Sequence, residues 1–174
     1  TTVVGEDDIW ILDRASIQRL GGEGLTRQIV IGDDVRDWGF SETAEVVYPY
    51  APLGGTLLPE LPVRPHRYLW PFRAVLESRS MFGETLRSQG RAWWEHLEHY
   101  GARLRVPRSI AFAFVTTLNH FVLARGNKVF NRSAPVIKMP HGTTEEDHLE
   151  LLGLLNSSSS AFWLRQVCHN KGNR

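Results

Sequence analysis

The segment SIAFAFVT, residues 109–116, constrains the fold more than any other stretch of the sequence. Side chains alternate between the two faces of a strand, so its isoleucine and phenylalanines share one face and its alanines and valine share the other. A strand that is apolar on both faces needs packing layers on both sides. The sequence therefore predicts that this strand is central in its sheet.

Shorter segments also have the apolar residues and turn boundaries that are typical of strands. In the N-terminal third these are residues 9–12, 27–32 and 45–50, and residues 135–139 predict a further short strand. A Gly-Asn pair between two apolar runs favours a tight hairpin. We therefore expect NHFVLA and KVFNR to pair across residues 125–128.

The middle of the chain has helical spacing. Apolar residues that recur at intervals of three and four predict a helix over residues 70–80, with Pro71 near its start. A stripe of Trp93, Leu97 and Tyr100 followed by Gly101 predicts a second helix over residues 91–101. A loop over residues 83–90 would join the two.

The C-terminal part predicts a pair of helices. Thr143 and Glu146 have capping-box spacing, and the leucine-rich segment that follows predicts a buried helix. The four serines at residues 157–160 indicate a break, because serine is a preferred N-cap. A last helix then contains AFWLRQVC, with Cys168 in apolar surroundings.

Together these segments predict a mixed α/β (α+β) fold, in which short, mostly antiparallel strands with a hairpin are packed by several helices, including the C-terminal pair. A length of 174 residues fits one domain over residues 1–174. The chain starts with Thr, and we interpret it as a fragment of a longer protein. A single cysteine and the lack of a long apolar run favour a cytoplasmic protein without a membrane span.

Charge is distributed unevenly, although the net charge is only +1. Residues 1–63 hold four Lys/Arg against eleven Asp/Glu, whereas residues 64–138 hold thirteen against four. A local excess of positive charge attracts polyanions, because neutralising phosphates releases counterions. The middle segment thus favours nucleic-acid binding, and a solvated basic face balanced by the acidic N-terminal third is the alternative.

Motifs that would indicate catalysis are absent from the sequence, including GxxxxGK[ST], GxGxxG, HExxH and GxSxG. His96 and His99 would share a helical face but have no evident third metal ligand. Turn formation and N-capping explain the aspartates of IGDDVRD better than a cation site. Cys168 is interpreted as a core residue rather than a nucleophile. We therefore predict no catalytic residue, metal or cofactor in this chain.

The order of several segments resembles the target-recognition (specificity) domains of TaqI-like adenine-N6 DNA methyltransferases, closest to the PglX-like enzymes of BREX phage-defence systems. The resemblance covers most of the chain. The segments that carry it are IVIGDDVRDW (residues 29–38), VVYPY (46–50), YLWPFRAVLESR (68–79), AWWEH (92–96), RVPRSIAFAF (105–114) and LLGLLNSSSSAFWLRQVCHNKG (151–172).

The resemblance implies that this chain binds duplex DNA and supplies sequence specificity, while a separate catalytic domain binds S-adenosylmethionine and methylates adenine. The implied partners are double-stranded DNA, that catalytic domain and other subunits of a restriction-modification or phage-defence system. Enzymes of this family hold the flipped adenine with an Asn-Pro-Pro-Tyr-type motif, and no such tetrapeptide occurs here.

Candidate DNA contacts are basic and amide side chains at predicted loops and strand ends. Arginine can read guanine and asparagine can read adenine through paired hydrogen bonds in the major groove. Arg36, in the family-like IGDDVRDW segment, is a further candidate, although pairing with Asp33 or Asp37 explains it better. The other candidates are Arg103, Arg105, Arg108, Arg125, Asn127, Lys128, Asn131 and Arg132.

Two other functions stay open from the sequence. The same basic face could dock an acidic partner subunit, which would make the chain a protein-interaction module. A stand-alone hydrolase or nuclease is the third reading, but no catalytic constellation can be assembled for it.

Overall fold

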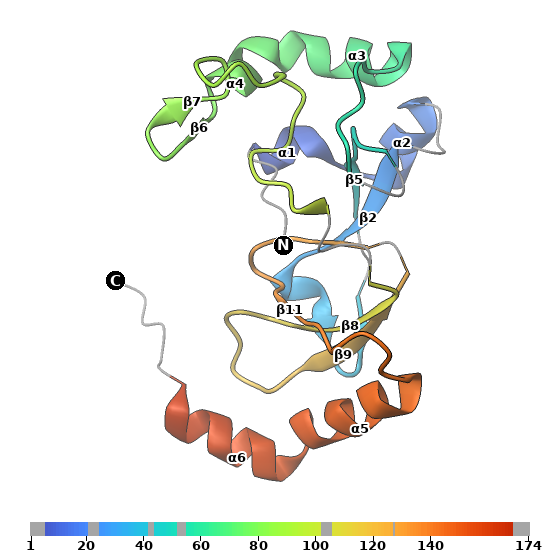
Figure 1. Ribbon diagram of the computed structural model, residues 1–174, viewed down its shortest axis with the longest axis vertical. Helices are drawn as coiled ribbons and strands as arrows, with labels where there is room; N and C mark the ends of the chain where they lie inside the picture. The colour runs from blue at the N-terminus through green and yellow to red at the C-terminus, as the bar shows by residue number, and fades with distance from the viewer. Residues whose placement is uncertain are drawn as a thin grey trace. The chain divides into compact units, whose positions relative to one another are not determined.

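The computed structural model describes residues 6–20, 25–41, 44–51, 55–101, 106–126 and 128–168 (Figure 1). The chain forms two compact units. Unit 1 consists of Thr1–Ile29 and Ala44–Arg105, and unit 2 consists of Val30–Thr43 and Val106–Arg174.

Unit 1 contains an antiparallel sheet in the order β1 (Ile11–Leu12), β5 (Glu45–Val47) and β2 (Thr26–Val30). The strands predicted at residues 27–32 and 45–50 are confirmed as β2 and β5. The strand predicted at residues 9–12 is only half right, because α1 (Asp7–Trp10) includes the first two of these residues. A second short helix, α2 (Arg14–Leu20), follows β1.

A helical arm of unit 1 runs through α3 (Val63–Leu69), the 3-10 helix η2 (Trp70–Phe72) and α4 (Arg73–Ser78). The predicted helix over residues 70–80 thus begins too late. Pro65 lies in the first turn of α3, where proline is tolerated because the first amides of a helix have no partner within it. The expected loop over residues 83–90 includes the second strand of a hairpin formed by β6 (Ser80–Met81) and β7 (Glu84–Thr85).

Residues 91–101 form turns, so the predicted second helix is wrong. The Glu95 carboxylate accepts hydrogen bonds from the Ala92 amide and the Arg91 guanidinium at 3.1 and 2.9 Å. The same guanidinium donates to the carbonyls of His96 and Leu97. Side chains therefore satisfy backbone groups that a helical ladder would otherwise have to satisfy.

Unit 2 contains a three-stranded antiparallel sheet in the order β11 (Val136–Ile137), β8 (Arg108–Phe112) and β9 (Phe121–Arg125). β8 lies in the middle, as its two apolar faces predict. On one face Ala111 packs with Val35 and Phe40, which come from the hairpin of β3 (Val35–Arg36) and β4 (Gly39–Phe40). On the other face Ile110 packs with Leu152. The strand is shorter than predicted, and Phe114 and Val115 are exposed.

The hairpin predicted around Gly126 is misplaced. The consecutive paired strands are β8 and β9, whereas β10 (Val129–Phe130) pairs with the end of β2 instead of β9. The amide of Asn131 donates to the carbonyl of Val30 at 2.9 Å. Gly126 does make a turn with a φ of +78°, but the chain beyond it joins a different partner.

Two consecutive helices close unit 2, α5 (Glu145–Leu155) and α6 (Ser158–Val167), as predicted. The capping box lies one residue later than expected, at Thr144 and Asp147. Ser157 is the N-cap of α6, and its hydroxyl accepts a hydrogen bond from the Ser160 amide, which confirms the interpretation of the serine run.

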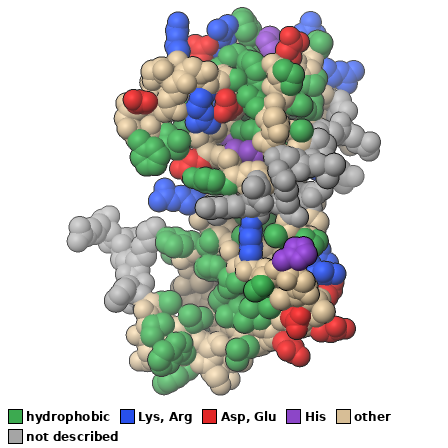
Figure 2. Space-filling model, viewed as in Figure 1, with side chains coloured by type: hydrophobic (Ala, Val, Ile, Leu, Met, Phe, Trp, Pro, Cys, Tyr) green, Lys and Arg blue, Asp and Glu red, His purple; other side chains and the backbone are tan. Residues whose placement is uncertain are grey.

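The C-terminal pair is less buried than the leucine content suggested. Leu152 is buried, but Leu149 and Leu154 are exposed, and Cys168 is exposed rather than part of a core. No residue of α6 is buried. On the face drawn in Figure 2, hydrophobic side chains gather over this helix.

Asn156, between the two helices, anchors them to the sheet. Its side-chain oxygen accepts from the Phe121 amide at 3.0 Å, and its side-chain nitrogen donates to the Phe121 carbonyl at 2.8 Å. Asn119 adds a hydrogen bond to the Leu155 carbonyl. The end of α5 is therefore held against β9 by polar contacts as well as by the apolar cluster around Leu152.

The predicted fold class is confirmed, with short, mostly antiparallel strands and several helices that include two at the C-terminus. Among the described residues, no helix combines the length and apolarity that crossing a membrane requires.

Candidate nucleic-acid interface

Two predicted DNA contacts, Arg108 and Arg125, lie directly opposite each other on β8 and β9. Both bind Glu145 at the start of α5. The Nε of Arg108 is 2.9 Å from one carboxylate oxygen, and an Nη of Arg125 is 2.6 Å from the other. Hydrogen bonds from Arg125 and Arg108 lower the pKa of the Glu145 carboxyl below its ordinary value. Much of the positive charge at this point is thus neutralised within the protein.

The turn that follows β9 brings further predicted residues together. The Nζ of Lys128 donates to the carbonyl of Arg125 at 2.9 Å and lies 6.0 Å above the ring of Phe40. The Asn131 side-chain oxygen accepts from the amide of Arg132 at 2.6 Å, while the Arg132 side chain is exposed. Arg103, Arg105 and Asn127 lie outside the described residues.

Arg36 belongs to a separate turn of unit 2. Its guanidinium donates to the carbonyls of Val35 and Gly32 at 2.7 and 3.2 Å. It also lies 3.4 Å from the carboxylate of Asp33, which confirms the expected ion pair with that residue. Asp34 accepts a hydrogen bond from the Ile31 amide, as the interpretation of these aspartates as turn formers predicted.

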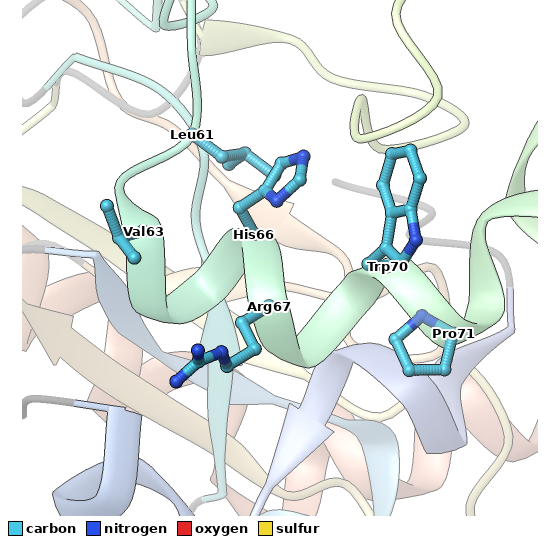
Figure 3. Close-up of a pocket in the computed structure, with 6 residues that line it drawn as sticks. All are labelled: Leu61, Val63, His66, Arg67, Trp70 and Pro71. Atoms are coloured by element: carbon cyan, nitrogen blue, oxygen red, sulfur yellow. The ribbon is translucent and has the colours of Figure 1, made fainter.

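Sequence reasoning missed a basic and aromatic surface on the helical arm of unit 1. A hollow of about 480 Å³ is lined by Leu61, Val63, His66, Arg67, Trp70 and Pro71. In Figure 3 the rings of His66 and Trp70 project from one side of the helix, whereas the side chain of Arg67 extends away from them. The sequence did contain a sign of this surface, because Arg64 and Arg67 are three residues apart. The helix was predicted to begin only at residue 70, after both arginines.

Trp70 contacts several side chains although it is 49% exposed. The guanidinium of Arg73 lies 4.9 Å from the centre of its ring system. Its indole also meets the buried Trp93 edge-on, with 6.1 Å between ring centroids, and the His66 ring at 5.2 Å. These neighbours orient the indole without covering it.

The two histidines considered as metal ligands belong to a core of rings. His96 is fully buried, and its Nε2 donates to the Val47 carbonyl at 2.8 Å, so the neutral ring carries its proton on that nitrogen. Burial lowers the pKa of His96 to about 3 and that of His99 to about 4. Within the described part of the chain, no group of three or more His, Cys, Asp or Glu side chains is placed to hold a metal.

Tight packing around His99 depends on Gly55. The His99 ring stacks on Tyr50 with 3.7 Å between centroids, and burial raises the pKa of the Tyr50 hydroxyl. A Cβ at Gly55 would lie 2.7 Å from His99 Nε2, and the residue has a φ of +63°. This arrangement is that of a packed core, in which neutral imidazoles serve as flat, polar-edged rings.

Comparisons with known proteins place these surfaces in context. No protein-family model matches the chain. Residues along almost its whole length are similar to part of the "Adenine-specific methyltransferase PglX" of Streptomyces coelicolor, with 39% identity over 175 residues. The match covers 98% of this chain but only 14% of that relative's length. The chain is thus homologous to one segment of a much longer adenine-specific methyltransferase.

Proposed function

We propose that this chain is the DNA target-recognition part of an S-adenosylmethionine-dependent adenine-N6 DNA methyltransferase in a restriction-modification or BREX-type phage-defence system. The observation that carries the proposal is the 39% identity to a segment of an adenine-specific methyltransferase. An Asn-Pro-Pro-Tyr tetrapeptide does not occur in this sequence. Adenine binding and the methyl donor are therefore assigned to another part of the longer protein.

The chemistry of base modification explains why such a part is needed. An enzyme that acts on a base takes it out of the stack, at a cost of a few kcal/mol. Contacts to phosphates fix the register of the protein on the duplex, and contacts to base edges provide specificity. Both units of the chain would serve this purpose as one recognition domain. Since its target is the cell's DNA, we assign the protein to the cytoplasm.

Within unit 2, the geometry favours the turn after β9 as the part that meets DNA. Lys128 and Arg132 are cationic side chains of that turn and the residues after it, and Asn131 lies beside them. Arg108 and Arg125 already share the carboxylate of Glu145, so they would bring less unneutralised charge to a phosphate or a base edge. The remaining proposed contacts are Arg36, Arg103, Arg105 and Asn127.

Duplex binding by the purified chain tests the proposal. Fluorescence anisotropy with a labelled duplex between 50 and 200 mM salt should give a log affinity that falls linearly with log salt, by about 0.9 per phosphate contacted. The parent methyltransferase serves as the reference, because two parts of one enzyme can grip DNA together. Polyglutamate is the competitor that represents an acidic protein partner.

The outcomes separate the candidate functions. Binding that prefers duplex over polyglutamate supports DNA recognition. Tighter binding to polyglutamate would favour the protein-interaction module that docks an acidic subunit. Two results together would refute the proposal. The purified chain would show no duplex affinity at 50 mM salt, and the parent methyltransferase would still bind DNA after deletion of the chain.

A further inference from the structure

The helical arm of unit 1 carries a row of side chains at intervals of three residues: Arg64, Arg67, Trp70 and Arg73. Residues three apart are neighbours on a helix surface. Arg64 and Arg67 lie in α3, Trp70 begins η2 and Arg73 begins α4. Each member of the row is therefore a neighbour of the next one along the arm.

Charge in this row is less neutralised than in unit 2. Residues 61–76 contain three arginines and no acidic residue. Arg64 and Arg67 are exposed, and neither has a carboxylate within 4.0 Å among the residues that the structure describes. Only Arg73 is paired, with Glu77 at 2.7 Å. Two cationic side chains are consequently available to an external anion.

The apolar half of the surface lies next to these cations. Trp70 and Arg67 both line the hollow of about 480 Å³, together with Leu61, Val63 and Pro71. A site of this kind offers guanidinium groups to phosphates and a flat, apolar wall to the sugar between them. Because Arg73, Trp93 and His66 already hold the indole, little conformational entropy would be lost on binding.

We propose that this row binds the sugar-phosphate backbone of duplex DNA, with Arg64 and Arg67 on successive phosphates and Trp70 against a deoxyribose. The inference rests on the proposed function and names a contact surface that the sequence did not predict. The ends of the row are nine positions apart, a length of about 14 Å in an α-helix. One strand presents about four phosphates over that distance along the duplex axis.

The test compares two double variants that remove the same charge. Arg64→Gln/Arg67→Gln should make the salt dependence shallower by about 1.8, which corresponds to roughly 60-fold weaker binding at 0.1 M salt. Arg19→Gln/Arg165→Gln is the matched control, since both of its arginines are exposed on other helices. The control should keep the wild-type slope. Circular dichroism would verify that both variants keep their helical content.

Trp70→Ala gives an independent reading of the apolar contact. Loss of the indole should weaken binding about tenfold, because roughly 50 Å² of apolar surface would no longer be buried against the sugar, while the salt slope stays unchanged. Arg73→Gln should have less effect than either Arg64→Gln or Arg67→Gln, because Arg73 already pairs with Glu77.

The possible failures are distinguishable. If the wild-type chain binds duplex DNA but Arg64→Gln/Arg67→Gln keeps its slope, the row is not a phosphate site while the proposed function stands. Equal losses in the test and control variants would also overturn the inference, because they would reflect net charge alone. If the wild-type chain has no duplex affinity and its deletion also leaves DNA binding by the parent intact, the inference is overturned together with the proposed function.

Discussion

Arginines in the two units are used in different ways. In unit 2, Arg108 and Arg125 share the carboxylate of Glu145 across neighbouring strands. In unit 1, Arg64 and Arg67 are exposed beside a half-exposed tryptophan, and Arg79 is buried. A count of thirteen basic residues between positions 64 and 138 does not distinguish these roles. The charge that a protein offers to a partner depends on which cations already have a partner inside the fold.

Arg79 provides the largest expected effect. Its guanidinium donates to the carbonyls of Leu76, Trp93 and Glu95 at 2.7 to 3.0 Å and lies 5.4 Å from the centre of the Trp10 ring. Arg79→Met would leave buried carbonyls without donors. We expect the free energy of unfolding to fall by about 3–5 kcal/mol, measured by urea titration.

Arg64→Met is the matched control, because the same substitution at an exposed position should change the free energy of unfolding by no more than about 0.5 kcal/mol. A loss of similar size in both variants would mean that burial does not distinguish these arginines, and the comparison would fail.

Acid should act on the two units in different pH ranges. His96 has a pKa of about 3 in the fold against an ordinary 6.5, so only the unfolded chain takes up this proton between those values. The free energy of unfolding should therefore fall as the pH drops below about 6.5, by up to about 1.4 kcal/mol per pH unit from each of His96 and His99, whose pKa is also lowered, to about 4. Glu145 has a lowered pKa, so its contribution is present above the ordinary 4.5 and is lost only as the pH falls through the lower folded value.

Urea titrations between pH 7 and pH 5 check this difference. His96→Gln keeps a donor for the Val47 carbonyl but does not titrate. It should lower the slope of the free energy of unfolding against pH by the contribution of about one proton. Glu145→Gln should leave the slope in this range unchanged. The slope that remains should be that of His99. A slope in His96→Gln as steep as in the wild type would show that His96 does not contribute to it.

Glu145→Gln tests the smallest energetic difference, the exposed pairing in unit 2. Neutralising this carboxylate removes the ionic partner of Arg108 and Arg125. We expect little change in stability, because exposed ion pairs contribute little. If the freed arginines meet phosphates, the salt slope of duplex binding should become steeper by up to about 1.8. An unchanged slope would show that removal of this carboxylate creates no new phosphate contact.

The pattern of apolar and polar residues within a segment predicted correctly those strands and helices that depend on neighbouring residues alone. The two apolar faces of β8 required a layer on each side, and the structure provides a hairpin on one and α5 on the other. A break with a serine cap was predicted at residues 157–160 because a serine side chain can satisfy a free helix amide, and Ser157 is that cap. Neither prediction needed knowledge of distant residues.

The wrong predictions concern segments whose structure depends on hydrogen-bond partners that are distant in sequence or that compete with a local helix or hairpin. The side chains of Arg91 and Glu95 form hydrogen bonds with the backbone of the segment that was predicted to be the second helix. The hydroxyl of Tyr50, which is distant in sequence, accepts a hydrogen bond from the His96 amide. The end of β2 captures β10 and so prevents the hairpin predicted at Gly126. Among the predicted contact residues, the ion pairs of Arg108 and Arg125 with Glu145 could not be read from a sequence separation of 20 residues or more.

The paired hydrogen bonds of Asn156 also have a consequence for the edge of the sheet. β9 is an outer strand, and outer strands can recruit a strand from another molecule and start aggregation. The Asn156 amide presents an acceptor and a donor to Phe121, as the backbone of an incoming strand would. One asparagine between two helices thereby closes the start of β9 to intermolecular strand addition.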